Sequence, residues 1–156
     1  VGDKVPSTSL KVMTKDGPKD VSTDDIFKGK KVALFAVPGA FTPTCSAQHL
    51  PSFVQKADEL KKKGINSIIC TSANDVFVMN AWGKDQNVGE KVMMVADGSA
   101  DFAEKMGLAL DLKARGMGTR SQRYSMVVED GVIKKLNVEQ AGAYEVSSAE
   151  HMLSQL

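Results

Sequence analysis

Residues 31–46, with the sequence KVALFAVPGAFTPTCS, decide the fold more than any other stretch of the chain. The run from Lys31 to Val37 is mainly apolar, which is typical of a central strand buried on both faces of a sheet. A turn follows, in which Pro38 and Pro43 fix φ, and Cys45 then stands where a helix should begin. The first-turn N–H groups and the positive end of the helix dipole favour a thiolate at such a position. The stretch therefore predicts a nucleophilic cysteine on a stiffened connection between a strand and a helix.

Outside this stretch, segments of strand and helix character alternate, which predicts an α/β arrangement around a central sheet. Further strands are expected in the apolar, β-branched segments Ile65–Thr71 and Val92–Ala96 and in the hairpin arms Tyr124–Glu129 and Val132–Val138. Apolar residues spaced three or four apart after Cys45 predict an amphipathic helix that ends near Gly64. Pro51 removes one backbone hydrogen bond in that helix and predicts a kink. No repeat or linker interrupts the sequence, so we expect one domain over residues 1–156.

Three local features complete the expected structure. Ser99 is expected to cap a short helix that Gly107 ends, and Ser147 with Glu150 forms a capping box for the terminal helix. Residues 111–121 contain two glycines and are interpreted as a functional loop.

The composition indicates a globular chain and excludes several classes of function. Of the 156 residues 42% are apolar, and 20 basic against 19 acidic residues give a net charge of +1. The basic run Lys61–Lys63 is expected to close a helix, so no nucleic-acid partner is predicted. No apolar run approaches the roughly 18 residues of a transmembrane helix, so no membrane partner is predicted. Two cysteines without dense spacing predict a reducing compartment. Because residues 1–3 carry no signal-peptide pattern, we expect a cytoplasmic location, or an organellar one if a targeting segment has been removed.

A family resemblance is carried by Pro38, Thr42 and Cys45, whose spacing P-x-x-x-T-x-x-C resembles the active-site motif of the peroxiredoxins. The longer sequence PGAFTPTCS, followed by Gln48-His49-Leu50-Pro51, resembles the type II (atypical, peroxiredoxin-5-like) branch. Matching blocks cover nearly the whole chain, namely Val1–Asp3, Asn74–Met79, Ala81-Trp82, Ala96–Ser99 and Gly118–Tyr124. The resemblance implies a thioredoxin-like α/β fold, with a central mixed β-sheet flanked by helices and an N-terminal extension.

The same resemblance implies a thiol peroxidase that reduces hydrogen peroxide and alkyl hydroperoxides to water and alcohols. The Cys45 thiolate would attack the O–O bond and become a sulfenic acid. The Thr42 hydroxyl would accept from the substrate and donate to sulfur or to a peroxide oxygen, and Pro38 would shield the thiolate from water. Arg123 matches the family's catalytic arginine because it directly precedes the aromatic Tyr124. Its guanidinium would stabilise the thiolate and bind the peroxide oxygens.

Three further residues are candidates for supporting roles. Arg120 is expected to assist Arg123. His49, four residues after Cys45, shares a helix face with it and either raises the thiolate fraction or is an ordinary polar residue of the first turns. Phe41 would line the entrance for the substrate or a dimer contact. The resemblance implies a homodimer.

The sulfenic acid must be reduced again by a second thiol, and the other cysteine of the chain, Cys70, is one candidate. Cys70 shares a strand face with Ile68, which favours a buried, inert residue, with a resolving partner for Cys45 as the alternative. Some type II relatives carry a resolving cysteine in the segment that corresponds to residues 142–147, and this segment contains none. We therefore expect an external thiol reductant (glutathione, glutaredoxin or thioredoxin), and no cofactor.

Three rival functions use the same residues. A redox sensor or relay without turnover would use the same sulfenic chemistry. A thiol hydrolase would pair Cys45 with His49 as its base, but no third orienting residue is evident. A zinc site built on Cys45 and His49 would need four ligands, and only Cys70 and His151 remain, so no metal is expected.

Overall fold

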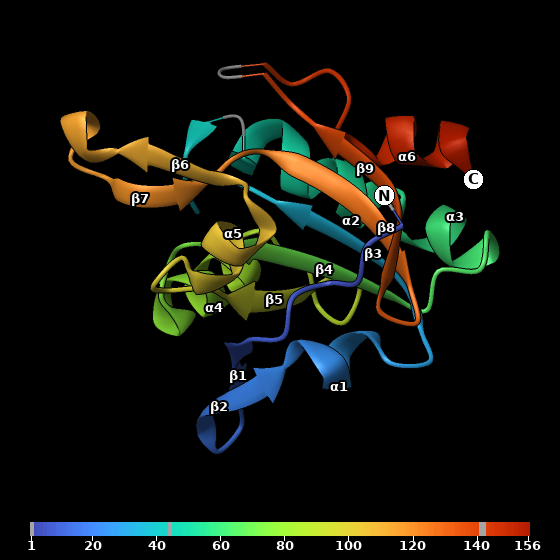
Figure 1. The fold of residues 1–156 in the computed structure, drawn as a ribbon, viewed down its shortest axis with the longest axis horizontal. Helices are drawn as coiled ribbons and strands as arrows, with labels where there is room; N and C mark the ends of the chain where they lie inside the picture. The colour runs from blue at the N-terminus through green and yellow to red at the C-terminus, as the bar shows by residue number, and fades with distance from the viewer. Residues whose placement is uncertain (1, 44, 141–142) are drawn as a thin grey trace.

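A computed structural model describes residues 2–43, 45–140 and 143–156, and its centre is a seven-stranded sheet with the order β2-β1-β5-β4-β3-β8-β9 (Figure 1). The strands are β1 (Ser9–Thr14), β2 (Gly17–Ser22), β3 (Lys31–Ala36), β4 (Ser67–Ser72), β5 (Met93–Ala96), β8 (Tyr124–Glu129) and β9 (Val132–Val138). Strands β3, β4 and β5 run parallel, whereas β1, β8 and β9 pair antiparallel with their neighbours. The expected central mixed sheet is confirmed.

Helices cover both faces of this sheet. They are α1 (Thr23–Phe27), α2 (Leu50–Gln55), α3 (Ala57–Lys62), α4 (Val76–Asp85), α5 (Asp101–Met106) and α6 (Ala149–Gln155). Side chains of α2, α3, α4 and α6 fill one core, and side chains of α1 and α5 fill the other. The β3 segment serves both cores alternately, as an apolar run buried on both faces should. Ala33, Phe35 and Val37 lie in the first core, and Val32, Leu34 and Ala36 in the second.

The helix after the turn is broken into three pieces. A π-helical turn, η1, spans Cys45–His49, α2 follows directly, and α3 begins after a break at Lys56. Pro51 has no N–H for the carbonyl of Ala47, and the α geometry is lost in the turn just before this proline. The helix geometry thus changes just before Pro51, and the kink expected there stays a prediction. The break at Lys56 has no counterpart in the sequence analysis. Gly64, with φ of +97°, follows the end of α3 as predicted.

Two of the predicted caps are wrong. The Asp97 carboxylate accepts hydrogen bonds from the N–H groups of Phe102 (3.1 Å) and Ala103 (3.0 Å), so it caps α5 in place of Ser99. At the terminal helix, Ser148 is the N-cap and accepts from the N–H of His151. Its neighbour Ser147 is fully buried, and its hydroxyl donates to the carboxylate of Glu139.

Residues 109–121 form a hairpin, so the segment 111–121, interpreted above as a functional loop, is largely regular structure. Strands β6 (Ala109–Leu112) and β7 (Gly118–Ser121) pair antiparallel around a short 3₁₀ turn, Lys113–Arg115. Figure 1 shows this hairpin extending away from the main sheet. Gly116, with φ of +72°, ends the turn where a side chain would be strained.

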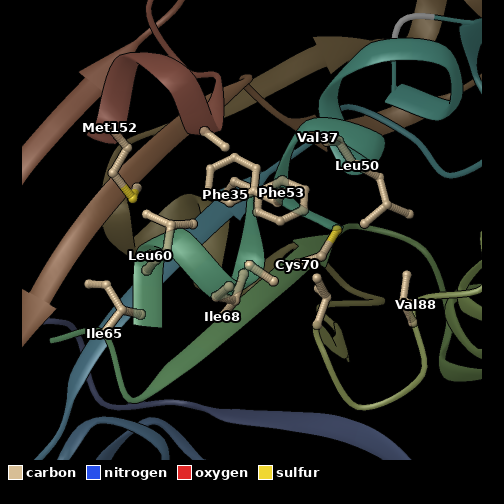
Figure 2. Close-up of a cluster of buried hydrophobic side chains, with 14 of the residues drawn as sticks. Phe35, Val37, Leu50, Phe53, Leu60, Ile65, Ile68, Cys70, Val88 and Met152 are labelled. Atoms are coloured by element: carbon tan, nitrogen blue, oxygen red, sulfur yellow. The ribbon is translucent and has the colours of Figure 1, made fainter. Parts of the chain in front are cut away.

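Cys70 lies in the middle of the first core. It belongs to β4, which pairs with β3 on one side and β5 on the other, and its side chain has no exposed surface. Figure 2 shows it beside Ile68 on the strand and below Leu50 and Phe53 of α2. The prediction of a buried strand cysteine is confirmed.

Candidate active site

The turn after β3 is tied to the neighbouring strand by one side chain. The Asn74 amide oxygen accepts from the N–H of Ala40 (2.8 Å) and from the hydroxyl of Ser72 (2.7 Å). The N–H of Val37 donates to the carbonyl of Thr71 at 3.1 Å. These bonds fix residues 37–40 against the carboxyl end of β4, the side of a parallel sheet on which ligands usually bind.

Phe41 has an unusual backbone conformation within this turn. Its φ is +63°, a left-handed value that costs a bulky residue on the order of 1–3 kcal/mol and is found mostly at functional sites. The side chain is 51% exposed, and its ring centroid lies 6.5 Å from that of the buried Trp82. Trp82 in turn donates its indole N–H to the hydroxyl of Ser46 at 3.0 Å. An exposed aromatic side chain is thus held at the edge of the turn.

The Thr42 hydroxyl is already committed as a donor. Its oxygen lies 2.7 Å from the carbonyl of Gly39 and donates to it, while the main-chain carbonyl of Thr42 accepts from the N–H of Ser46 at 2.9 Å. A hydroxyl has one proton, so in this conformation Thr42 can only accept from a substrate. The expected donation to sulfur or peroxide oxygen would require the bond to Gly39 to break.

Cys45 is the first residue of the η1 turn, which agrees with its expected position at a helix start. The carbonyl of Thr42 receives the N–H of Ser46, so Cys45 lies within the first turn. Its side chain lies outside the described part of the structure. The arrangement of the site is therefore given by the residues around it.

His49, at the end of η1, is fully buried, and both of its ring nitrogens have partners. Its Nδ1 lies 2.8 Å from Nη1 of Arg123, and its Nε2 lies 2.9 Å from the carbonyl oxygen of Ser147. A guanidinium can only donate, so Nδ1 accepts, and Nε2 carries the proton that is donated to Ser147. Burial and the Arg123 charge together lower the pKa of His49 to about 3. The imidazole is neutral at physiological pH.

These contacts remove two rival roles for His49. A general base for Cys45 needs a free lone pair and a pKa near the operating pH, and a zinc ligand needs a ring nitrogen to offer. His49 has no ring nitrogen free for either role, because Nδ1 accepts from Arg123 and Nε2 donates to Ser147. In this conformation His49 therefore has no free lone pair with which to act as a base for Cys45.

The two candidate arginines reach different parts of the site. Arg120, on β7, donates from Nε to the carbonyl of Met117 (2.8 Å), and its Nη1 lies 3.5 Å from the carbonyl oxygen of Pro38. Arg123, just before β8, binds His49 and lies with its guanidinium carbon 5.9 Å from the centre of the Tyr144 ring. The structure thus brings Arg120 to the turn and Arg123 to the helix that Cys45 begins.

Sequence reasoning missed several residues that organise this site. Asn74 entered the sequence analysis only as part of a block that resembles the family, and no role in the site was expected for it. Its neighbour Asp75 caps α4 by accepting from the N–H of Val78. Glu139, Tyr144 and the carbonyl of Ser147 carry no local pattern that points to the site. Each meets its partner through contacts between segments far apart in the chain.

The chain is similar to a known protein family along nearly its whole length. Residues 1–153 match the Redoxin family. The chain is 49% identical over 160 residues to chloroplastic peroxiredoxin-2E of Arabidopsis thaliana, an alignment that covers all of this chain and 68% of that protein. This chain is a peroxiredoxin of the Redoxin family. The peroxiredoxin is also 49% identical over 157 residues to peroxiredoxin-2D of the same plant, with 100% of this chain and 97% of that protein covered.

Solved structures agree with the sequence relatives. The peroxiredoxin superposes on reduced Prx3 from Vibrio vulnificus in complex with H2O2 with a TM-score of 0.95 at 48% identity, covering 99% of this chain and 96% of the other. The thioredoxin-like fold and the similarity to the type II branch are confirmed. The protein is a thiol peroxidase, which uses a peroxide substrate and a thiol reductant. Its relatives do not favour a sensor without turnover. Within the described residues, no helix of this peroxiredoxin has the length and apolar character needed to cross a membrane.

The buried position of Cys70 leads to a first prediction for this peroxiredoxin. Cys70→Ser is expected to keep peroxide turnover and to lose stability, because a hydroxyl buried in an apolar core costs roughly 1–3 kcal/mol. Thermal unfolding and a peroxide-consumption assay measure the two effects. Cys70→Ala adds no hydroxyl and serves as the matched variant. Loss of turnover in both variants, with the fold intact, would contradict a mechanism that uses one cysteine.

Proposed function

We propose that Cys45 is the cysteine that attacks the peroxide. The thiolate sulfur attacks the terminal oxygen of the hydroperoxide, so that an S–O bond forms as the O–O bond breaks. The leaving alkoxide or hydroxide takes up a proton and becomes an alcohol or water. Cys45 is left as a sulfenic acid. The observation that carries the proposal is that Arg123 binds the last residue of the turn that Cys45 begins, while Arg120 lies against the turn that precedes it.

Each neighbouring residue has a role in this step. Arg123 stabilises the thiolate and the charge that develops on the leaving oxygen, since a guanidinium offers several donors in one plane. Thr42 accepts from the hydroperoxide O–H, the one function that its bond to Gly39 leaves it. Pro38 excludes water from the thiolate, and Phe41, exposed at the edge of the turn, lines the approach of the substrate.

His49 and Arg120 act on the reaction through other groups. His49 offers the lone pair of Nδ1 to Arg123 and so directs the guanidinium, a role that a neutral imidazole can fill and a charged one cannot. Arg120 donates to the Pro38 carbonyl from the hairpin side and lies close to Gly39, where a side chain would meet its Nη1 at 3.3 Å.

Resolution of the sulfenic acid uses an external thiol. The chain has two cysteines, and the second, Cys70, is fully buried among apolar side chains on β4, which disfavours it as the resolving partner. Glutathione with glutaredoxin, or thioredoxin, is the proposed reductant. We also propose one domain over residues 1–156, a homodimer, and a location in the cytoplasm or, as for the chloroplastic relatives, in an organelle.

The test is steady-state consumption of hydrogen peroxide with each reductant in turn. Glutathione plus glutaredoxin, or thioredoxin with its reductase, is expected to sustain many turnovers per enzyme in wild type and in Cys70→Ser alike. A single turnover that stops with every reductant would instead favour the sensor. Turnover that depends on Cys70 would contradict external resolution.

A further inference from the structure

The carboxylate of Glu139 gathers the backbone of a distant loop. Its Oε2 accepts from the N–H groups of Glu145, Val146 and Ser147, each at 2.8 Å, and from the hydroxyl of Ser147 at 2.6 Å. Glu139 follows directly after β9 and is only 6% exposed. Burial would raise the pKa of this carboxyl, but the hydrogen bonds from Ser147, Val146 and Glu145 hold it below its usual value. The group is therefore an ionised anchor for residues 145–147.

Ser147 connects this anchor to the active site. Two of its donors, the N–H and the hydroxyl, bind Glu139, and its carbonyl oxygen accepts from Nε2 of His49. The His49 ring is held by aromatic neighbours, with centroids 4.8 Å from Phe35 and 5.2 Å from Tyr144. A buried ring held in this way depends on the Ser147 carbonyl as the acceptor for its N–H.

The position of the proton on His49 decides whether Arg123 can bind it. With the proton on Nε2, Nδ1 presents a lone pair to the guanidinium. With the proton on Nδ1, two donors would face each other and Arg123 would be repelled. The acceptor that stabilises the first tautomer is the carbonyl of Ser147, and a second partner of this kind commonly fixes the tautomer of a functional histidine.

We propose that Glu139 is a positioning residue for Arg123: by fixing Ser147, it selects the tautomer of His49 that accepts from the arginine. The inference rests on the proposed role of Arg123. By this proposal the site extends from the turn around Cys45 to the loop before α6. No residue of that loop contacts the reacting atoms.

Glu139→Gln tests this link with little change in shape. The amide retains an oxygen acceptor but loses the charge, and charge-assisted hydrogen bonds are about twice as strong as neutral ones. The 15N chemical shifts of the histidine side chains report the tautomer directly, and with His49 and His151 as the two histidines the assignment is simple. We expect pure Nε2–H at His49 in wild type and a mixture in the variant. The rate constant for oxidation of Cys45 by hydrogen peroxide should fall about tenfold or more, as a small displacement of a catalytic group can cause.

Two control variants separate positioning from general loosening. Glu145→Gln removes an exposed carboxylate from the same loop, and Ser148→Ala removes the cap of α6 and lowers stability. Both should keep the tautomer and the rate. An unchanged tautomer or an unchanged rate in Glu139→Gln overturns the inference. If Arg123→Lys also reacts at the wild-type rate, the proposed role of Arg123 fails as well; if Arg123→Lys is slow, only the link to Glu139 fails.

Discussion

Cys45→Ser is expected to lose all peroxide turnover while it keeps the fold. A serine hydroxyl has nearly the shape of the thiol but is not ionised at neutral pH, so the first turn of the helix has no thiolate to stabilise. Stopped-flow consumption of hydrogen peroxide, at excess glutathione and glutaredoxin, should show only the background rate. The circular dichroism spectrum should be unchanged, because the substitution replaces a single sulfur atom with oxygen.

The matched variant for this prediction is Cys70→Ser, in which the same substitution falls in the core. It should show the opposite pattern, with turnover kept and the melting temperature lowered. Residual turnover in Cys45→Ser that disappears in the double variant would assign the reaction to Cys70 and contradict the proposal.

Arg123→Lys is expected to slow the reaction with peroxide at least about tenfold, which corresponds to about 1.4 kcal/mol of barrier. Lysine keeps the charge but lacks the planar set of donors. A single ammonium on a flexible stem cannot hold the bond to His49 Nδ1 and direct a second donor in the same plane. The rate constant for oxidation of Cys45, measured at several pH values, should fall, and the apparent pKa of the thiol should rise.

Arg115→Lys is the control for this change, because Arg115 is exposed in the 3₁₀ turn of the hairpin. It should react at the wild-type rate. Similar melting temperatures in both variants would exclude a folding defect as the cause. A near-normal rate in Arg123→Lys would transfer the role to Arg120, whose guanidinium lies near the carbonyl of Pro38.

The central fold follows from local sequence patterns because its strongest features are local. The apolar run 31–37 predicts the buried strand β3, and the Asp130-Gly131 pair predicts the turn between β8 and β9. The structure has both. Asp130 and Gly131 have φ of 49° and 80°, as a tight two-residue hairpin turn requires. These features need no knowledge of distant contacts.

The wrong cap of the terminal helix was decided by a contact that the local sequence does not show. Ser147 and Ser148 are equally good caps in sequence, and the choice falls on Ser148 because Glu139 takes the hydroxyl of Ser147. The site itself behaves in the same way. Spacing placed His49 on the face of Cys45, but its partners Arg123 and Ser147 come from segments 74 and 98 positions away. Arg123 could be found only through the family resemblance.

The most direct test of the account is to locate the oxidised sulfur after one equivalent of hydrogen peroxide. The reduced protein is treated without any thiol present, trapped with a reagent specific for sulfenic acids, digested and analysed by mass spectrometry. We predict one adduct, on Cys45, in equal yield in wild type and in Cys70→Ser. An adduct on Cys70, or a disulfide between Cys45 and Cys70 in place of the adduct, would contradict attack by Cys45 with resolution by an external thiol.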